Sequence, residues 1–445
     1  MNPATNNPTS DFVVGLGATG LSIARYLRRN EQSATFYDTR TEPPGVDELR
    51  SLLPNAQLLL GSIDLPDHVD RVIASPGVSD SHPILVKARD TKVEVISDIE
   101  LFAREAEAPF IAVTGSNGKS TVTTLLHYMC KAAGLDVLAG GNLGEPALDL
   151  LDKPVPDIYV LELSSFHLQR THELPAAVSI LLNISPDHLD WHTDEAEYRR
   201  SKYRIYREAK SAVYNRADPK AKEMVSPIDR VTSFGIDEPQ DGHYGLRVED
   251  GITYLARGET LLLSTRDLAM YGIHNQLNAL AALAAGELAG LDMPSMLSVL
   301  CEFPGLPHRM QFVRRVAAVD YVNDSKATNV AAAVASIKSV DGMLVLIAGG
   351  DGKGGDFTEL APVLENKLRA AVLVGKDAGP ISDALDTVMP VYFAGDMDDA
   401  VQQAALYAEP DDTVLLAPAC ASLDQYDNYM ARGDAFRDAV VELRQ

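Results

Sequence analysis

A glycine-bounded segment followed by a lysine and two hydroxyl residues is the part of this chain best suited to bind a phosphate. After the apolar run 110–113 and Thr114, the segment reads Gly115, Ser116, Asn117, Gly118, Lys119, Ser120 and Thr121. Backbone N–H groups and the start of a following helix attract an anion, Lys119 adds charge, and Ser120 can hold Mg²⁺. Val113 replaces the first glycine of the full phosphate-loop pattern, so an ordinary glycine-rich turn remains the alternative.

Three more residues are candidate ligands in the same part of the chain. Glu162 ends the apolar run 159–161, where a carboxylate can complete a Mg²⁺ shell begun by Ser120; the alternative is a helix-capping or loop acid. His188 follows a second buried strand, and a bystander histidine is an equally good interpretation. Lys202 stands among arginines, and its local sequence alone indicates a solvated basic face.

A second glycine pattern lies near the N-terminus. Gly15, Gly17 and Gly20 follow the apolar strand 12–14, and Asp38 comes about 20 residues later, as in dinucleotide-binding domains. Taken alone, the pattern indicates an oxidoreductase, but no constellation elsewhere in the sequence suggests hydride transfer. We therefore predict a diphosphate-bearing ligand, with Asp38 or Arg40 near its sugar or base.

Composition narrows the class of protein. The chain has 445 residues, of which 46% are hydrophobic and 6% aromatic, as expected for an α/β protein of about two to four domains. A formal net charge of −24 opposes nucleic-acid and membrane partners, so lysine, arginine and metal must meet any anionic substrate locally. Three separated cysteines, a polar N-terminus and no run of transmembrane length predict a cytoplasmic protein.

Strand-like and helix-like runs alternate almost throughout, which predicts parallel sheets covered by helices. The rhythm divides into three domains, with expected boundaries at 1–98, 99–304 and 305–445. We expect a Rossmann-like N-terminal domain, a central phosphate-loop mononucleotide-binding domain and a Rossmann-like C-terminal domain. The segment 303–307, rich in proline and glycine, has the composition of a hinge.

Seven sequence blocks, in the right order and spread over most of the chain, resemble the Mur ligase family. They are 114–121, 161–166, 187–188, 198–202, 272–279, 305–309 and 323–329. Two further blocks, 418–426 and 432–433, together with the N-terminal glycine pattern, are similar to the branch of the family that adds D-glutamate.

The resemblance implies an ATP-dependent amide-bond ligase of cytoplasmic peptidoglycan precursor synthesis. In such an enzyme a carboxylate of UDP-N-acetylmuramoyl-L-alanine attacks the γ-phosphate of ATP, and positive charge must screen the meeting of two anions. The amine of D-glutamate then attacks the acyl phosphate, and a tetrahedral intermediate expels phosphate. The resemblance also implies two Mg²⁺ sites, with Mn²⁺ as a substitute metal, and a monomer.

The resemblance assigns roles to residues of the central and C-terminal domains. The catalytic residues would be Lys119, Glu162, His188 and Lys202. Ser120 and Glu162 would hold one metal, and His188 and Lys202 the second, with Lys202 carrying a carbamate. ATP would contact the loop Gly115–Thr121 and also Asn275, Arg309 and Asp324.

The substrate-binding residues are implied in the same way. The uridine diphosphate would contact Ala18, Thr19, Asp38, Arg40 and Gly77, and the muramoyl-alanine end would contact Asn142 and His188. D-Glutamate would contact Lys326, Thr328, Lys353, Ser422, Leu423 and Tyr429. The sequence departs from the family pattern at His167, where an amide-type residue is expected, and at Tyr429, where Phe is commoner. These departures affect fine specificity, and closure of the third domain is expected around residues 303–308.

Other functions remain to be separated from this one. A folate polyglutamate ligase shares the ATP chemistry but lacks the leading glycine-pattern domain. A Mur ligase that adds L-alanine, a diamino acid or a dipeptide is the nearer alternative. A nucleotide-sensing protein without enzymatic activity would need neither a second metal nor an amino-acid site, and release of ADP distinguishes it.

Overall fold

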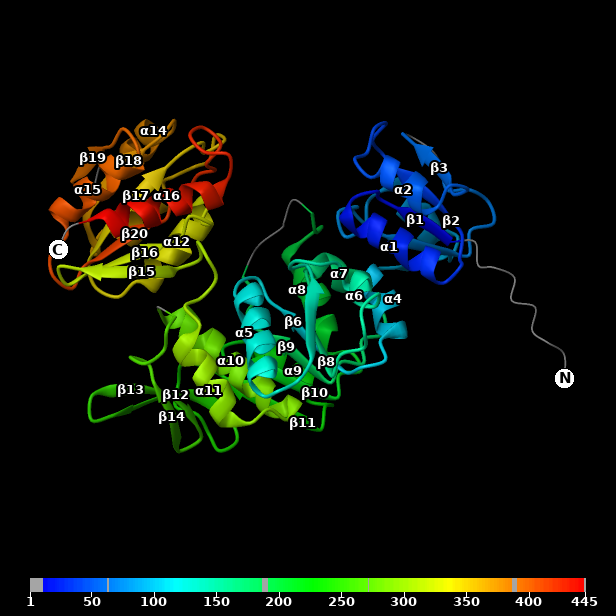
Figure 1. The fold of residues 1–445 in the computed structure, drawn as a ribbon, viewed down its shortest axis with the longest axis horizontal. Coiled ribbons are helices and arrows are strands. Elements are labelled where there is room, and N and C mark those ends of the chain that lie inside the picture. The colour runs from blue at the N-terminus through cyan, green and yellow to red at the C-terminus, as the bar shows by residue number, and fades with distance from the viewer. Residues whose placement is uncertain (1–10, 62–63, 186–190, 271, 386–389, 444–445) are drawn as a thin grey trace. The chain divides into compact units, whose positions relative to one another are not determined.

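The alternation of strand-like and helix-like runs produces three separate sheets in the computed structural model, which describes residues 11–61, 64–185, 191–270, 272–385 and 390–443 (Figure 1). The chain forms two compact units. The first consists of residues 1–264 and 277–299, and the second of residues 265–276 and 300–445. Among the described residues, no helix has both the length and the apolar character that a membrane crossing requires.

The N-terminal sheet is parallel, in the order β3-β2-β1-β4-β5. Its elements are β1 (Asp11–Val14), α1 (Ala18–Arg29), β2 (Ala34–Asp38), α2 (Val46–Leu52), β3 (Gln57–Leu60), β4 (Arg71–Ala74), α3 (Pro83–Asp90) and β5 (Glu94–Ile96). The strand order changes direction beside β1, so the loops after β1, β2 and β4 meet at one sheet edge.

The central sheet has the order β14-β13-β12-β11-β10-β9-β6-β8-β7. Its strands are β6 (Phe110–Thr114), β7 (Val137–Gly141), β8 (Ile158–Glu162), β9 (Val178–Leu181), β10 (Ser211–Asn215), β11 (Arg230–Phe234), β12 (Tyr244–Glu249), β13 (Ile252–Arg257) and β14 (Thr260–Ser264). The helices of this region are α4 (Asp98–Glu105), α5 (Lys119–Ala132), α6 (Ala147–Leu150), α7 (Ser165–Gln169), α8 (Glu195–Tyr203), η1 (Arg204–Tyr206), α9 (Pro219–Val225), α10 (Ile273–Ala289) and α11 (Met293–Glu302).

The C-terminal sheet has the order β15-β16-β20-β17-β18-β19. Its elements are β15 (Gln311–Val316), β16 (Val319–Asn323), α12 (Val330–Ser339), β17 (Leu344–Gly349), α13 (Leu360–Leu364), β18 (Leu368–Val374), α14 (Ala378–Ala384), β19 (Val391–Phe393), α15 (Met397–Tyr407), β20 (Thr413–Leu416) and α16 (Tyr429–Glu442). Alternate residues of β17 enter two different cores. Leu344 and Leu346 pack with residues of α12, and Val345 and Ile347 pack with residues of α15 and α16.

The prediction of a three-domain α/β fold is confirmed, while two local predictions are wrong in detail. Strands β12, β13 and β14 pair antiparallel, as do β15 and β16, because connections of only two residues cannot carry a parallel crossover. The sequence pattern also predicts a long helical stretch around 195–209, but α8 ends at Tyr203 and the chain continues only as the short 3₁₀ helix η1.

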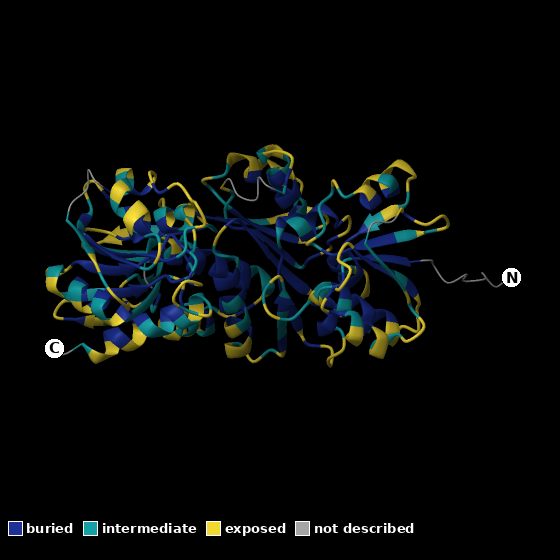
Figure 2. Cartoon of the chain, turned by 90° about the horizontal axis from the view of Figure 1, so that it is seen from above, coloured by how far each residue is buried: buried dark blue, intermediate teal, exposed yellow. Residues whose placement is uncertain are grey.

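The N-terminal and central domains share one hydrophobic core. Val13 and Ile73 of the first sheet belong to the same buried cluster as Phe102 of α4 and Ala112 of β6. In Figure 2 inner strands such as β1, β6 and β17 are coloured as buried, whereas the outer faces of the helices carry many of the exposed residues. The shared core explains why these two domains form one compact unit.

Candidate nucleotide and substrate sites

The predicted phosphate loop lies between β6 and α5, where the central sheet brings its parallel strand ends together. Gly118 caps the helix with a φ of 83°, and a Cβ there would lie 2.4 Å from Oδ1 of Asn278. Both the positive φ and the close contact favour glycine at this position. The backbone N–H of Ser116 donates to the Asn183 carbonyl at 2.9 Å, and that of Asn117 donates to Asn183 Oδ1 at 2.9 Å. The loop is thus fixed to the segment that follows β9.

Two lysines lie on this loop. Nζ of Lys119 donates to the carbonyl oxygens of Gly115 and Ser116, both at 2.9 Å. Nζ of Lys202, from α8, donates to the same Gly115 carbonyl at 2.8 Å and lies 4.9 Å from the Tyr198 ring centroid. Lys202 is only 2% exposed, so the interpretation of a solvated basic face is wrong. The arginines near Lys202 in the sequence suggested an exposed side chain, but Lys202 is buried against the phosphate loop, which lies far away in the sequence.

Glu162 ends β8 beside the phosphate loop. It pairs with Val113 of β6 in the parallel register and is 2% exposed. Nδ2 of Asn142 donates to its Oε1 at 2.6 Å, whereas its Oε2 is buried with no hydrogen-bond partner among the described residues. A buried carboxylate oxygen in this state fits a divalent cation, and Ser120 at the start of α5 supplies a second oxygen of the type Mg²⁺ prefers.

The second predicted metal site is only partly visible. His188 lies outside the described residues, so its prediction stays a prediction. No group of three or more His, Cys, Asp or Glu side chains with a metal-binding arrangement occurs in the part of the chain that the structure describes. The four predicted ligands are Ser120, Glu162, His188 and Lys202, and only two of them are side chains of those four types, so the predicted set does not form such a group.

All five residues predicted to contact the uridine diphosphate line one pocket of about 350 Å³ in the N-terminal domain. Its walls are the loop after β1, the end of β2 and the turn Ser75–Val78 after β4. The predicted residues on these walls are Ala18, Thr19, Asp38, Arg40 and Gly77. The pocket therefore sits at the carboxyl edge of the sheet, where open α/β sheets bind their ligands.

Asp38 holds two of these walls together. Its Oδ2 accepts the Leu16 N–H and Nη2 of Arg40, each at 2.8 Å, and its Oδ1 accepts Nε of Arg40 at 2.9 Å. Burial alone would raise the pKa of Asp38, but the hydrogen bonds from Arg40 and Leu16 outweigh it and lower the pKa to about 2. The carboxylate therefore orders the glycine loop, and the half-exposed Arg40 presents its charge at the rim.

The residues predicted to bind D-glutamate lie on three neighbouring loops at the carboxyl edge of the C-terminal sheet. Lys326 and Thr328 follow β16, Lys353 follows β17, and Ser422 and Leu423 follow β20; Tyr429 begins α16. Nζ of Lys326 lies 4.1 Å from the ring centroid of Tyr429, and a backbone bridge joins Asp351 to Ala421. Ser422 is buried, whereas Leu423 and Lys353 are exposed.

The residues predicted to contact ATP outside the phosphate loop fall in the second compact unit. Asp324 follows β16, where Ser336 donates a hydrogen bond to Oδ2 and the Met310 N–H donates to Oδ1 at 3.2 Å. Burial raises the pKa of Asp324. Arg309 is exposed, and Asn275 is buried in the first turn of α10.

Two further residues organise these sites, although the sequence suggested no role for them. Arg432 of α16 is 2% exposed and donates from Nη2 to the carbonyls of Ser325 at 2.9 Å and Cys420 at 3.1 Å, and from Nη1 to that of Gly349 at 3.3 Å. Burial lowers its pKa to about 10. It thus fixes all three loops of the predicted D-glutamate site. Asn278 packs against Gly118. Because it lies three residues after Asn275, and so on the same face of α10, its place near the phosphate loop could have been predicted from the sequence.

The departure at His167 has a structural explanation. Nδ1 of His167 accepts the Ser164 N–H at 3.2 Å, while Oγ of Ser164 accepts the His167 N–H at 3.2 Å. The two residues form the capping box of α7, a role that glutamine also fills. Burial lowers the pKa of His167, so the neutral ring is favoured.

A phosphate-loop domain between two Rossmann-like domains defines a nucleotide-dependent α/β protein, and comparison with known sequences gives its family. Residues 9–97 match the Mur ligase MurD-like N-terminal domain, residues 113–286 the Mur ligase middle domain, and residues 308–420 the Mur ligase glutamate ligase domain. The chain belongs to the Mur ligase family.

Relatives in this family are similar over their full length. The UDP-N-acetylmuramoylalanine–D-glutamate ligase of Nitrosococcus oceani is 48% identical over 98% of this chain and 97% of its own. The enzyme of the same name from Legionella pneumophila is 46% identical over 97% of this chain and 99% of its own. The crystal structure of MurF ligase from Thermotoga maritima in complex with ADP has a TM-score of 0.60 at 18% identity, covering 98% of this chain and 99% of that one, and supports the fold.

Proposed function

We propose that this chain joins D-glutamate to UDP-N-acetylmuramoyl-L-alanine with cleavage of ATP to ADP and phosphate. The observation that carries the proposal is the MurD-like N-terminal domain, with its pocket at the glycine loop, in a chain that is similar along its whole length to D-glutamate ligases. We also propose the domain boundaries 1–98, 99–304 and 305–445, and a cytoplasmic monomer.

The phosphate loop and Lys119 are proposed to bind the phosphates of ATP. Backbone N–H groups at the start of α5 provide donors, and the ammonium of Lys119 adds a positive charge that stabilises the negative charge of the phosphates. The substrate carboxylate attacks the γ-phosphorus, the bond to ADP breaks, and an acyl phosphate forms. The amine of D-glutamate then attacks the acyl carbon and loses a proton as phosphate leaves.

Glu162 and Ser120 are proposed to hold one Mg²⁺, and His188 and Lys202 the second. Bound there, Mg²⁺ would neutralise charge on the transferred phosphate and bring the two anions together. Asn142 orients Glu162 through its contact with Oε1. Lys202 is proposed to carry a carbamate, formed when its amine adds to CO₂ with loss of a proton, which would turn a cation into a metal-binding anion.

The C-terminal loops are proposed to bind D-glutamate. Lys326, Lys353 and the hydroxyls of Thr328 and Ser422 suit a substrate with two carboxylates. Burial and the nearby Arg309 lower the pKa of Lys326.

Phosphate release from ATP tests the proposal directly. The protein is incubated with ATP, Mg²⁺ and UDP-N-acetylmuramoyl-L-alanine, and receives D-glutamate, L-glutamate, L-alanine or meso-diaminopimelate in separate reactions. We expect turnover with D-glutamate alone. Turnover only with another amino acid would overturn the acceptor, and bound ATP without turnover in any reaction would favour the nucleotide-sensing alternative.

A further inference from the structure

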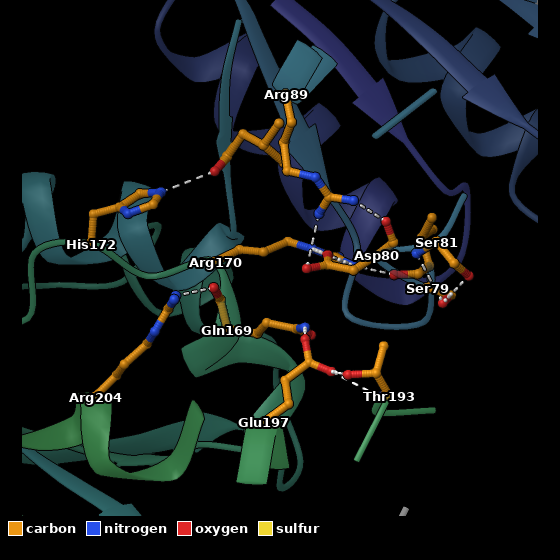
Figure 3. Close-up of polar contacts among 12 residues, drawn as sticks. Ser79, Asp80, Ser81, Arg89, Gln169, Arg170, His172, Thr193, Glu197 and Arg204 are labelled. Atoms are coloured by element: carbon orange, nitrogen blue, oxygen red, sulfur yellow. Dashed lines mark hydrogen bonds and ion pairs between the residues drawn. The ribbon is translucent and has the colours of Figure 1, made fainter. Parts of the chain in front are cut away.

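Arg170 extends from the central domain to the backbone of the N-terminal domain. It caps the C-terminus of α7, and its side chain is 3% exposed. Nη1 donates to the Ser75 carbonyl at 3.1 Å, Nη2 donates to the Val78 carbonyl, and Nε donates to Oδ1 of Asp80 at 2.7 Å. Figure 3 shows the side chain directed at Asp80. One guanidinium therefore contacts three residues that follow β4.

The segment that Arg170 contacts is a wall of the N-terminal pocket. Residues 75–78 line the pocket and form a turn in which the Val78 N–H donates to the Ser75 carbonyl at 3.0 Å. Oγ of Ser75 also donates to the Gly15 carbonyl at 3.2 Å. The guanidinium is rigid and planar, so its donors fix the two carbonyls of the turn relative to each other.

The same arginine is anchored to the linker between the domains. Its carbonyl accepts the Ser97 N–H at 3.0 Å, and the hydroxyls of Ser97 and Thr171 lie 2.9 Å apart. Arg170 lies at the C-terminal end of α7. The N-terminal end of this helix is capped by Ser164, and the helix begins three residues after Glu162. A single short helix therefore connects the carboxylate beside the phosphate loop to the wall of the N-terminal pocket.

The contact with Asp80 is the replaceable part of this arrangement. Asp80 is 27% exposed in its side chain and also pairs with Nη1 of Arg89 at 3.1 Å, as Figure 3 shows. Of the residues that Arg170 contacts, Arg89 binds only Asp80, and the side chain of Arg89 is 46% exposed. An exposed pair of this kind contributes little. Loss of Arg170 instead removes a buried donor from two turn carbonyls, of which the Ser75 carbonyl keeps its hydrogen bond from the Val78 N–H.

We infer that Arg170 is a positioning residue for the nucleoside diphosphate part of the substrate. Its hydrogen bonds to the Ser75 and Val78 carbonyls hold the turn Ser75–Val78 in position, and the position of this turn determines how well the pocket binds a diphosphate. This inference rests on the proposed function for the identity of the ligand. It adds a determinant of substrate affinity that lies in the central domain, outside the pocket itself.

Variants at two arginines separate this role from a purely structural one. Arg170→Ala and Arg170→Lys are compared with the matched control Arg89→Ala, which removes an arginine from the same network but leaves the turn carbonyls paired. Calorimetric titration with UDP, without ATP or amino acid, measures the pocket alone. Kinetics with the full set of substrates then give kcat and each KM.

We expect Arg170→Ala to weaken UDP binding and to raise the KM for the UDP-linked substrate by about tenfold, the effect of losing one or two buried hydrogen bonds. The KM values for ATP and the amino acid should stay unchanged, Arg170→Lys should be intermediate, and Arg89→Ala should match the unmodified protein. Unchanged UDP affinity in the folded Arg170→Lys and Arg170→Ala variants, or equal losses for all substrates, would overturn the inference. The inference would also be overturned if the unmodified protein did not bind UDP.

These results are distinguishable from failure of the proposed function. UDP binding that depends on Arg170, in a protein that does not turn over D-glutamate, would support the positioning role and reject only the acceptor. If Arg170→Ala does not fold, the intermediate effect of Arg170→Lys on UDP affinity decides the question.

Discussion

At the scale of single residues, the two carboxylate oxygens of Glu162 have different environments. Oε1 is held by Asn142, and Oε2 is buried without a hydrogen-bond partner among the described residues. Glu162→Gln keeps the size of the side chain and removes its charge. We predict that kcat falls by at least about 100-fold, because even outer partners of a metal contribute about 10–100-fold. Phosphate release measured across a Mg²⁺ titration checks this prediction. It would be contradicted if Glu162→Gln were as active as the unmodified protein at saturating Mg²⁺.

Two glycines of the N-terminal pocket allow a test of ligand contact against fold stability. A Cβ at Gly77 would have no atom within 4 Å, whereas a Cβ at Gly20 would lie 2.1 Å from the Gly15 carbonyl oxygen. We predict that Gly77→Ala changes the free energy of unfolding by less than about 0.5 kcal/mol. It should nevertheless raise the KM for the UDP-linked substrate, since Gly77 lines the pocket.

Gly20→Ala is the matched variant for that experiment. We expect it to destabilise the protein by about 1–3 kcal/mol, because a backbone carbonyl cannot move away cheaply. Denaturant unfolding and steady-state kinetics measure the two effects. Loss of stability in Gly77→Ala would show that this glycine serves the fold, and an unchanged KM would contradict its contact with the ligand.

At the scale of elements, α7 depends on a histidine in its capping box. Burial lowers the pKa of His167, although Asp98, 3.9 Å from Nε2, favours the charged ring. The unfolded chain takes up this proton near pH 6.5, so the stability linked to the neutral ring is full above that pH and is lost below it. We predict that His167→Gln, which keeps the cap, reduces the acid-induced loss of stability.

The size of the effect follows from linkage. One unit below the unfolded pKa, the native protein should have lost up to about 1.4 kcal/mol that His167→Gln retains. Melting temperatures between about pH 7.5 and pH 5.5 check this, and the other histidines contribute equally to both proteins. His167→Ala is the control, because it removes both the charge and the cap. Parallel pH profiles for the native protein and His167→Gln would contradict the prediction.

The sequence predicted those features that depend on neighbouring residues. The phosphate loop, the glycine pattern and Glu162 each follow an apolar run directly, and the sheets place them at strand ends. Features that need contact between distant segments were not predictable from the sequence. Lys202 looked exposed because the Gly115 carbonyl that binds it lies far away in the chain, and Arg432 showed no sign of the three loops that it joins.

At the scale of the whole molecule, the N-terminal and central domains behave as one body in their contacts. Besides the shared core, Arg25 of α1 makes two hydrogen bonds to Asp149 of α6, from Nε at 2.9 Å and from Nη2 at 2.6 Å. The pocket of the N-terminal domain, the phosphate loop and Arg170 all belong to this unit. The predicted D-glutamate residues all belong to the other unit.

The buried cluster that contains Val13 and Ala112 lies in the first unit, and the two clusters on either side of β17 lie in the second. We therefore predict that calorimetry resolves two unfolding transitions and that UDP raises the melting temperature of only one of them. A ligand at 100 times its Kd stabilises the state that binds it by about 2.7 kcal/mol, and the whole UDP pocket lies in the first unit. Gly77→Ala serves as the control, since weaker binding should reduce the shift without moving either transition in the absence of UDP. A single cooperative transition would contradict the independence of the units. Equal shifts of both transitions would instead mean that UDP binding stabilises the second unit, which contains none of the residues that line its pocket.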